Sequence, residues 1–354
     1  MSNQHHTKSL KILRVAKSNR SKKKNFKYFQ PDGSSVKDKN TLERINKIRI
    51  PPNYDRVKIS NNPNSKVQAI GIDNKGRKQY MYHPDFVNYK KNIKYEQYVI
   101  LGKYLKQIQN DVNKIIDSVH SKPYAKWKQP STNMALVIYL LDKCLFRIGN
   151  HRYYTLYGSH GTITLQAQHI SLIDDKKLVT IKFIGKKGVI NTATLTDTKI
   201  YNIFKTLKTK QRTSGHDFLF NYTSNKLDFS ITGDDVQKFL SNYNSMITPK
   251  MFRTWHTNCC FIFMIKDKID FLKNLESAGK LTQKIKKSFL KESMLEISQK
   301  LHNTPTVLKN SYLDNMIFDL FLNNSGKLIK IIDKNRNLPK EKLLILLASK
   351  LRNK

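Results

Sequence analysis

The spacing of apolar residues changes early in the chain, and this change constrains the fold more than any other feature of the sequence. Residues 66–83 form two extended runs around an Asn-Lys-Gly turn, which is the pattern of a β-hairpin. The runs 95–116 and 133–146 carry apolar residues at helical spacing instead. This succession predicts an α+β chain with a small β-rich domain over residues 45–90 and a larger, mainly helical domain over residues 91–322.

Three Lys-rich segments fall outside that pattern. Residues 1–44 have many basic side chains and few apolar partners, which predicts a flexible basic arm. Such an arm follows a phosphate backbone, serves as a targeting signal or is simply solvated. Residues 266–300 predict a helical connection, and residues 323–354 a basic C-terminal extension.

The charge balance indicates the class of partner. The chain has 65 Lys and Arg residues against 26 Asp and Glu, which gives a formal net charge of +39. A field of this size favours polyanions over small acidic molecules, so we expect nucleic acid as the partner. Biased codon usage is a competing explanation for the lysines, but it does not explain why acidic residues are so few.

The cysteines and the apolar runs bear on the compartment. Cys144, Cys259 and Cys260 lack the number and spacing of a zinc site or a disulfide framework, which fits a reducing compartment. The longest apolar run, 259–265, is far too short to cross a bilayer, and no secretory signal pattern is present. We therefore expect an intracellular, DNA-associated protein without a membrane partner.

The stretch 303–312 places a tyrosine on a newly started helix. Thr304 is a good N-cap, and Pro305 suits the first helical position. Apolar residues then recur at helical spacing, which predicts one helix to about Leu322 that carries Tyr312. Packing alone would explain such a tyrosine, and only the residues upstream suggest chemistry.

Two arginines could act with this tyrosine. Arg147 lies where a predicted helix gives way to a loop, and Gly149 lets a backbone or a ligand approach closely. Arg253 follows the helix start Thr248-Pro249, where backbone N–H groups and the helix dipole favour a bound anion.

Two β-hairpins carry further candidates. Lys186 and Lys187 stand at the tip of one hairpin, from which a lysine can reach into a site and deliver a proton. In the other hairpin, Gln79, Tyr80 and Tyr82 put an amide and two rings on a strand with neighbouring cations, a composition that suits a DNA groove.

Together these motifs resemble the type IB DNA topoisomerases of the small poxvirus, giant-virus and bacterial kind. The resemblance covers residues 45–320 and depends on the order of the motifs more than on any one of them. The matching motifs are Arg147-Ile148-Gly149-Asn150, Phe183-Ile184-Gly185-Lys186, Lys250-Met251-Phe252-Arg253-Thr254, Asn303-Thr304-Pro305 before Tyr312, Ile50-Pro51-Pro52, residues 71–80 and Tyr82-His83-Pro84.

The resemblance implies a fold shared with tyrosine recombinases, a monomer that closes round duplex DNA as a clamp, and a mechanism without ATP, metal or another cofactor. It implies that Tyr312 attacks a backbone phosphate to form a 3′-phosphotyrosyl link. Arg147 and Arg253 then bind the non-bridging oxygens, Lys186 protonates the leaving 5′-oxygen, and Asn303 is the fifth catalytic residue. The residues that the resemblance implies for DNA binding are Gln79, Tyr80, Tyr82, Gly149, Tyr153 and Lys250.

Two positions and two functions stay open. His302 competes with Asn303, because poxvirus members have His at that catalytic position, and Lys187 competes with Lys186. A tyrosine recombinase would share the chemistry, but that family usually has His where this chain has Lys250. A non-catalytic DNA-compacting protein would explain the charge but not the motifs. The sequence has neither an ATP-binding GxxxxGK[ST] loop nor a paired-carboxylate motif for Mg²⁺.

Overall fold

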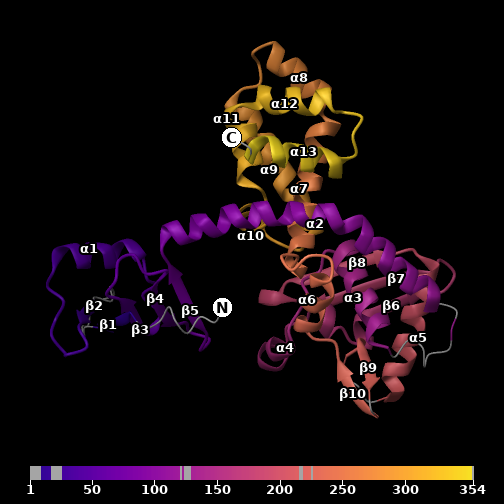
Figure 1. The fold of residues 1–354 in the computed structure, drawn as a ribbon, viewed down its shortest axis with the longest axis horizontal. Coiled ribbons are helices and arrows are strands. Elements are labelled where there is room, and N and C mark those ends of the chain that lie inside the picture. Colours follow the sequence, from indigo (N-terminus) through magenta and orange to yellow (C-terminus); the bar gives the residue numbers. More distant parts are fainter. Residues whose placement is uncertain are drawn as a thin grey trace. The chain divides into compact units, whose positions relative to one another are not determined.

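A computed structural model describes residues 9–16, 26–119, 122, 129–214, 218–224 and 226–352. It divides into two compact units, residues 1–94 and 95–354 (Figure 1). No helix among the described residues combines the length and the apolar character that a membrane span requires.

The first unit is a five-stranded antiparallel sheet with one helix. The strand order is β2-β1-β3-β4-β5, and the helix is α1 (Lys39–Ile48). Ile45 of α1 shares a buried core with Ile12, Val57, Ile59 and Ala69 from the sheet. The strands are β1 (Leu10–Ala16), β2 (Phe26–Phe29), β3 (Asp55–Ser60), β4 (Val67–Ile72) and β5 (Lys78–Tyr82).

The predicted hairpin around residue 75 is confirmed as β4 and β5, in which Ile70 pairs with Tyr80 and Gly71 pairs with Gln79. The flexible arm predicted over residues 1–44 is wrong for its described part, because β1 and β2 belong to the sheet. Buried Ile12 anchors β1, and the guanidinium of Arg14 donates to the carbonyl oxygens of Pro51 and Tyr54. Residues 1–8 and 17–25 of that prediction lie outside the described residues.

The second unit surrounds helix α7 (Pro249–Asp267). Phe252, Trp255, Phe261 and Ile262 of this helix are fully buried. At one end of the unit lie α3, α4, α5, α6 and the short strands, and at the other end lie the C-terminal helices (Figure 1). The helices are α2 (Pro84–Val119), which begins in the first unit, α3 (Pro130–Lys143), α4 (His151–Tyr157), α5 (Thr198–Ser214), α6 (Gly233–Ser241), α8 (Ile269–Ser277), α9 (Gln283–Lys300), α10 (Pro305–Ser311), α11 (Asn315–Asn323), α12 (Ser325–Lys334) and α13 (Lys340–Arg352).

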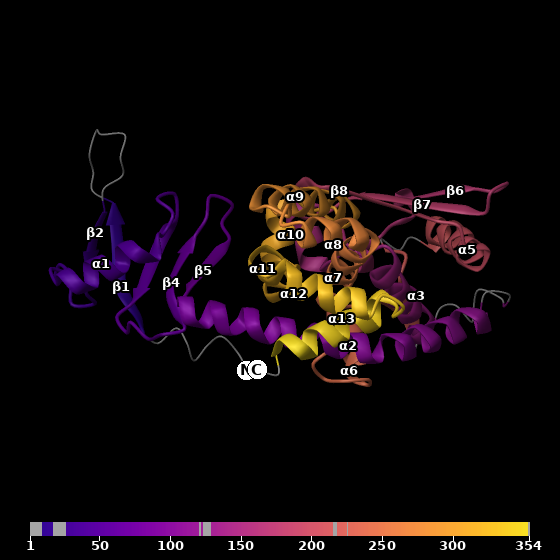
Figure 2. The ribbon, with the colours of Figure 1, turned by 90° about the horizontal axis from the view of Figure 1, so that it is seen from above.

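The strands of the second unit form an antiparallel sheet in the order β6-β7-β8 and a separate hairpin of β9 and β10. Helix α5 packs on the three-stranded sheet (Figure 2). The strands are β6 (Ile170–Ile173), β7 (Leu178–Ile184), β8 (Ile190–Leu195), β9 (Asn221–Ser224) and β10 (Leu227–Ser230), and the 3₁₀ turns are η3 (Thr162–Thr164), η4 (Ala167–His169) and η5 (Lys186–Gly188).

The single helix predicted from Thr304 to about Leu322 is wrong. Thr304 caps α10 and Pro305 opens it as expected, but this helix ends at Ser311. Tyr312 has φ −131° and ψ −38°, and Asp314 begins α11 by accepting a hydrogen bond from the backbone N–H of Met316. Apolar spacing missed the break, because the residues on both sides of it face the same core.

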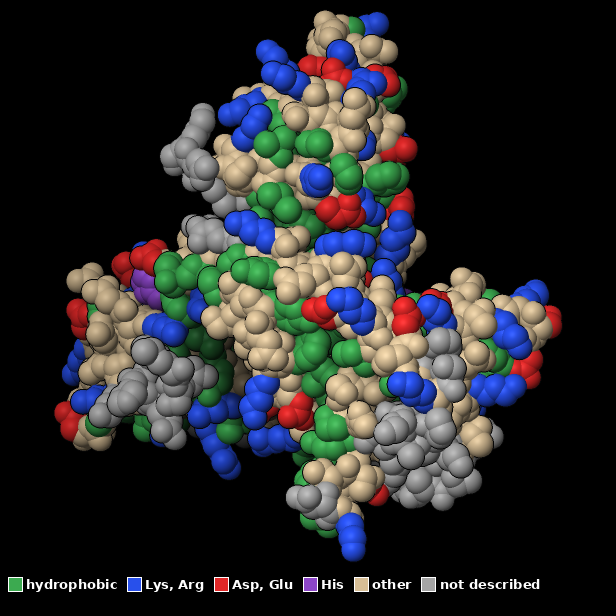
Figure 3. Space-filling view, turned by 45° about the vertical axis from the view of Figure 1, so that its right-hand side comes forward, with side chains coloured by type: hydrophobic (Ala, Val, Ile, Leu, Met, Phe, Trp, Pro, Cys, Tyr) green, Lys and Arg blue, Asp and Glu red, His purple; other side chains and the backbone are tan. Residues whose placement is uncertain are grey.

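The C-terminal helices are part of this core rather than an appendage. Leu328, Ile332, Leu343 and Leu347 of α12 and α13 are fully buried. Lys and Arg side chains are spread over the outside of these helices, at the top of the view in Figure 3. The basic residues between 323 and 352 therefore cover a folded surface.

Candidate active site

Tyr312 lies in the break between α10 and α11 with only 5% of its surface exposed. Asn258 of α7 holds the backbone there, because its Nδ2 donates to the Tyr312 carbonyl oxygen at 3.0 Å and its Oδ1 accepts from the Asp314 N–H at 2.8 Å. No local pattern singles out Asn258, since an amide on an apolar helix resembles many others. The phenol is thus attached to a backbone that a buried side chain holds in place.

Arg253 is the arginine nearest to the phenol. It is only 2% exposed, and its guanidinium carbon lies 4.9 Å from the centroid of the Tyr312 ring. Its terminal nitrogens donate to the carbonyl oxygens of Leu145 and Leu301, which anchors the side chain between two loops. The predicted helix start is present, with Pro249 at the first position of α7.

Arg147, whose charge acts on the Tyr312 phenol, and Asn303 lie on two different loops. Arg147 follows α3, and its Nη2 donates to Asn303 Oδ1. The loop of Arg147 is held by backbone bonds, since its carbonyl accepts from the Thr162 N–H at 2.9 Å. Gly149 allows the loop of Arg147 to lie against the backbone of residues 161–162, because a Cβ at position 149 would lie 2.9 Å from the Gly161 Cα. The φ of Gly149, +88°, also suits glycine.

His302 has a different place from Asn303. Its backbone has a φ of +50°, and its ring packs 6.1 Å from the ring of Phe146. Burial lowers the pKa of His302, and the nearby positive charges of Arg253 and Arg147 lower it further. Of these two neighbours, Asn303 is the one that forms a hydrogen bond with Arg147.

Two buried N–H donors at this site have no hydrogen-bond partner among the described residues. They are Nε of Arg253 and Nδ2 of Asn303. An orphaned buried donor costs about 1–3 kcal/mol, so an anion that accepted from both donors would remove this cost. Together with Arg147, they form a group of donors suited to an anion.

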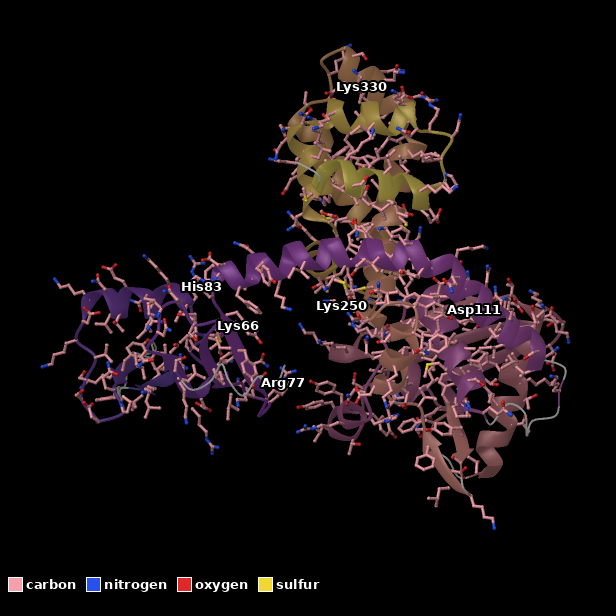
Figure 4. All side chains as sticks on the ribbon, viewed as in Figure 1. Lys66, Arg77, His83, Asp111, Lys250 and Lys330 are labelled. Carbon is pink, nitrogen blue, oxygen red and sulfur yellow. The ribbon has the colours of Figure 1, made fainter. Side chains whose placement is uncertain are left out.

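Positive charges around Tyr312 lower the pKa of its phenol. Burial alone would raise the pKa of Tyr312, but the positive charges of Arg253, Arg147 and Lys250 outweigh it and the net pKa is lowered. Lys250, labelled in Figure 4, lies at the start of α7 with its Nζ 5.6 Å from the Tyr312 ring centroid. The same arrangement would stabilise negative charge on a phosphate.

Lys186 lies on another element, the 3₁₀ turn η5. Lys186 and Lys187 are exposed at the tip between β7 and β8, where the backbone of Lys187 has a φ of +65°. Among the described residues, no hydrogen bond joins either lysine to Tyr312, Arg147, Arg253 or Asn303. The predicted hairpin is confirmed.

The predicted DNA contacts outside the cluster are partly exposed aromatic residues. Tyr153 on α4 is exposed, and its ring stacks 6.0 Å from that of Tyr157. In the first unit, the rings of Tyr80 and Tyr82 stack 6.2 Å apart on β5, and Gln79 donates to Asp73 at 2.9 Å. Such rings offer stacking surface, and no described contact assigns them to a groove.

Comparisons with known proteins agree on one family. The family model described as "Eukaryotic DNA topoisomerase I, catalytic core" matches residues 83–335, and "Bacterial DNA topoisomerase IB, N-terminal domain" matches residues 25–73. The chain is 28% identical over 309 residues to the "DNA topoisomerase 1B" of Acanthamoeba polyphaga mimivirus, a match that covers 84% of this chain and 85% of that protein.

Two further relatives carry related names. The "DNA topoisomerase I" of Monkeypox virus is 23% identical over 309 residues, which is 82% of this chain and 88% of that protein. The "DNA topoisomerase 1" of Mycosarcoma maydis is 24% identical over 224 residues, which is 58% of this chain and 21% of that protein.

Proposed function

Because the chain belongs to the type IB DNA topoisomerase family, we propose that Tyr312 is the nucleophile with which it relaxes supercoiled double-stranded DNA. The observation that carries this assignment is the group of donors around the phenol, above all the two buried N–H groups that lack a partner. A phosphodiester would supply the missing acceptors.

The chemistry then follows from the charges. Tyr312 Oη forms a bond to phosphorus, the bond from phosphorus to the 5′-oxygen breaks, and the phenol proton passes to solvent. Negative charge grows on the non-bridging oxygens, which Arg147, Arg253 and Asn303 stabilise as preorganised donors. In the reverse step the free 5′-hydroxyl attacks the 3′-phosphotyrosyl link, whose energy makes resealing independent of ATP.

Lys186 supplies the proton that the leaving 5′-oxygen requires. Its exposed position on a hairpin tip supports this role, because a side chain there can move to the leaving group once DNA is bound. The proton goes from Nζ to the 5′-oxygen and returns when the strand is resealed.

The remaining residues bind the duplex. Lys250 adds a cation beside the phenol, and Tyr153 and Gly149 belong to the α4 region next to Arg147. Gln79, Tyr80 and Tyr82 of the first unit contact base edges or sugars, and the two units close round the DNA as a clamp. We propose that a monomer does this.

Incubation with supercoiled plasmid in the presence of EDTA and the absence of ATP tests the assignment. The wild-type chain should relax the plasmid and form a covalent adduct at the 3′ end of the cut strand, with a free 5′-hydroxyl. Tyr312→Phe should bind DNA but form no adduct. An adduct in Tyr312→Phe, or attachment to the 5′ end, contradicts the assignment.

A further inference from the structure

A buried contact ties the break that carries Tyr312 to helix α2. The phenol of Tyr98 on α2 donates to Asp314 Oδ2 at 2.9 Å. The other carboxylate oxygen of Asp314 accepts from the Met316 N–H at 2.9 Å and so caps α11. Tyr98 and Asp314 are both 0% exposed.

The same tyrosine touches the helix that carries Arg253. Its ring lies 6.2 Å from the ring of Trp255, two residues after Arg253 on α7. A Cβ on Gly102, one turn along α2 from Tyr98, would lie 2.1 Å from the Trp255 ring, so α2 and α7 meet closely here. Tyr98 therefore contacts both elements that hold the reacting groups in the proposed mechanism.

We propose that Tyr98 is a positioning residue for the cleavage step. The hydrogen bond from Tyr98 holds Asp314 and so holds the backbone two residues after Tyr312. This backbone lies in the break between α10 and α11, where no helix supports it. The inference rests on the proposed function of Tyr312. Tyr98 presents no surface to DNA, so its loss changes the rate of bond breaking and not the affinity for DNA.

The substitution Tyr98→Phe tests this, because it removes one oxygen and keeps the ring that packs on Trp255. The rate of covalent adduct formation on supercoiled plasmid is measured with enzyme in excess. Affinity for a duplex is measured by fluorescence anisotropy with Tyr98→Phe placed in the non-cleaving Tyr312→Phe background. We expect the rate to fall about 10- to 100-fold, as a displacement of about 1 Å commonly causes, while the dissociation constant stays unchanged.

Tyr201→Phe is the matched control. Tyr201 lies on α5 in the same unit and is only 1% exposed, and its phenol oxygen has no hydrogen-bond partner among the described residues. Its substitution should leave the rate unchanged. A rate for Tyr98→Phe equal to that of Tyr201→Phe overturns the proposal, as does a parallel loss of rate and affinity.

A double-mutant cycle tests the path through Asp314. If Tyr98 acts through this carboxylate, Tyr98→Phe should slow cleavage little further in an Asp314→Ala background. Fully additive losses overturn that path. If Asp314→Ala does not fold, the comparison of Tyr98→Phe with Tyr201→Phe still decides whether Tyr98 acts on the cleavage rate. A wild-type chain that forms no adduct overturns the proposed function itself, whereas active wild type with active Tyr98→Phe overturns only the role of Tyr98.

Discussion

The arginine cluster and the lysine hairpin differ in how far each is assembled in the free chain. Arg253 is buried and anchored to two carbonyl oxygens, and Arg147 is bonded to Asn303, so these donors have fixed positions without DNA. Lys186 stands exposed at the end of β7 with no hydrogen bond to that cluster among the described residues.

This difference follows from what each part has to stabilise. Charge on the non-bridging oxygens changes little in position during cleavage and religation, so fixed donors serve both directions. The proton donor has to serve a leaving group that departs and returns, and a fixed buried ammonium would be costly to desolvate. The proposed mechanism therefore combines buried, anchored donors with an acid on an exposed hairpin tip.

The broadest expected effect comes from the arginines, because Arg253→Ala should lower both the rate and the stability, whereas Arg147→Ala should lower the rate. Each substitution removes a donor to the phosphate and should slow adduct formation by about 10²- to 10³-fold or more. Only Arg253→Ala also leaves the carbonyls of Leu145 and Leu301 without their buried donor, which should lower the free energy of unfolding by about 1–3 kcal/mol.

Single-turnover adduct assays and chemical denaturation measure the two quantities. Arg147 is half-buried and bonds one side chain, so Arg147→Ala should unfold close to wild type. Equal losses in the free energy of unfolding would mean that Arg253 contributes no more to stability than Arg147 does. That result would contradict the structural role assigned to Arg253.

The second effect tests the lysine hairpin. Lys186→Ala should slow cleavage about 10²- to 10⁴-fold, the usual contribution of a general acid, without changing stability. A substrate with sulfur in place of the bridging 5′-oxygen has a leaving group that needs no proton, so it should restore the rate of Lys186→Ala but not that of Arg147→Ala. Rescue of Lys187→Ala instead would assign the role to the neighbouring lysine.

The sequence predicted the local parts of this arrangement better than its connections. Thr304-Pro305, Thr248-Pro249 and the β7–β8 hairpin depend on neighbouring residues, and all three form as expected. The bond from Arg147 to Asn303 joins residues 156 positions apart, and no local pattern contains it. The family resemblance supplied that grouping, which spacing alone could not.

The errors have the same origin. Residues 10–16 were predicted to be a flexible arm because their basic side chains dominate the composition, whereas one buried Ile12 and pairing with β3 order them. At Tyr312 the local cap of α11 by Asp314 is joined by partners distant in sequence, Asn258 and Tyr98, which hold the break. Tertiary contacts override a continuous helical pattern in such cases.

The smallest expected effect is a shift in the titration of Tyr312. Its pKa lies below the ordinary tyrosine value near 10, because the charges of Arg253 and Arg147 outweigh the opposing effect of burial. If the pKa of a tyrosine is lower in the folded chain than in the unfolded chain, its ionisation stabilises the fold. This stabilisation is complete at pH values above the unfolded pKa and is lost as the pH falls through the folded pKa. The stability of wild type relative to Tyr312→Phe should therefore rise with pH between these two values.

Phenolate absorbance of wild type minus that of Tyr312→Phe measures this titration directly, and the difference removes the signals of the other tyrosines. Arg147→Ala should move the midpoint upward, because it deletes one charge that favours the phenolate. Lys186→Ala should leave the midpoint in place, since the hairpin lysine is no part of the preformed cluster. A midpoint above 10 in wild type would mean that burial outweighs the arginines, and a shift in Lys186→Ala would place the hairpin beside the phenol before DNA is bound.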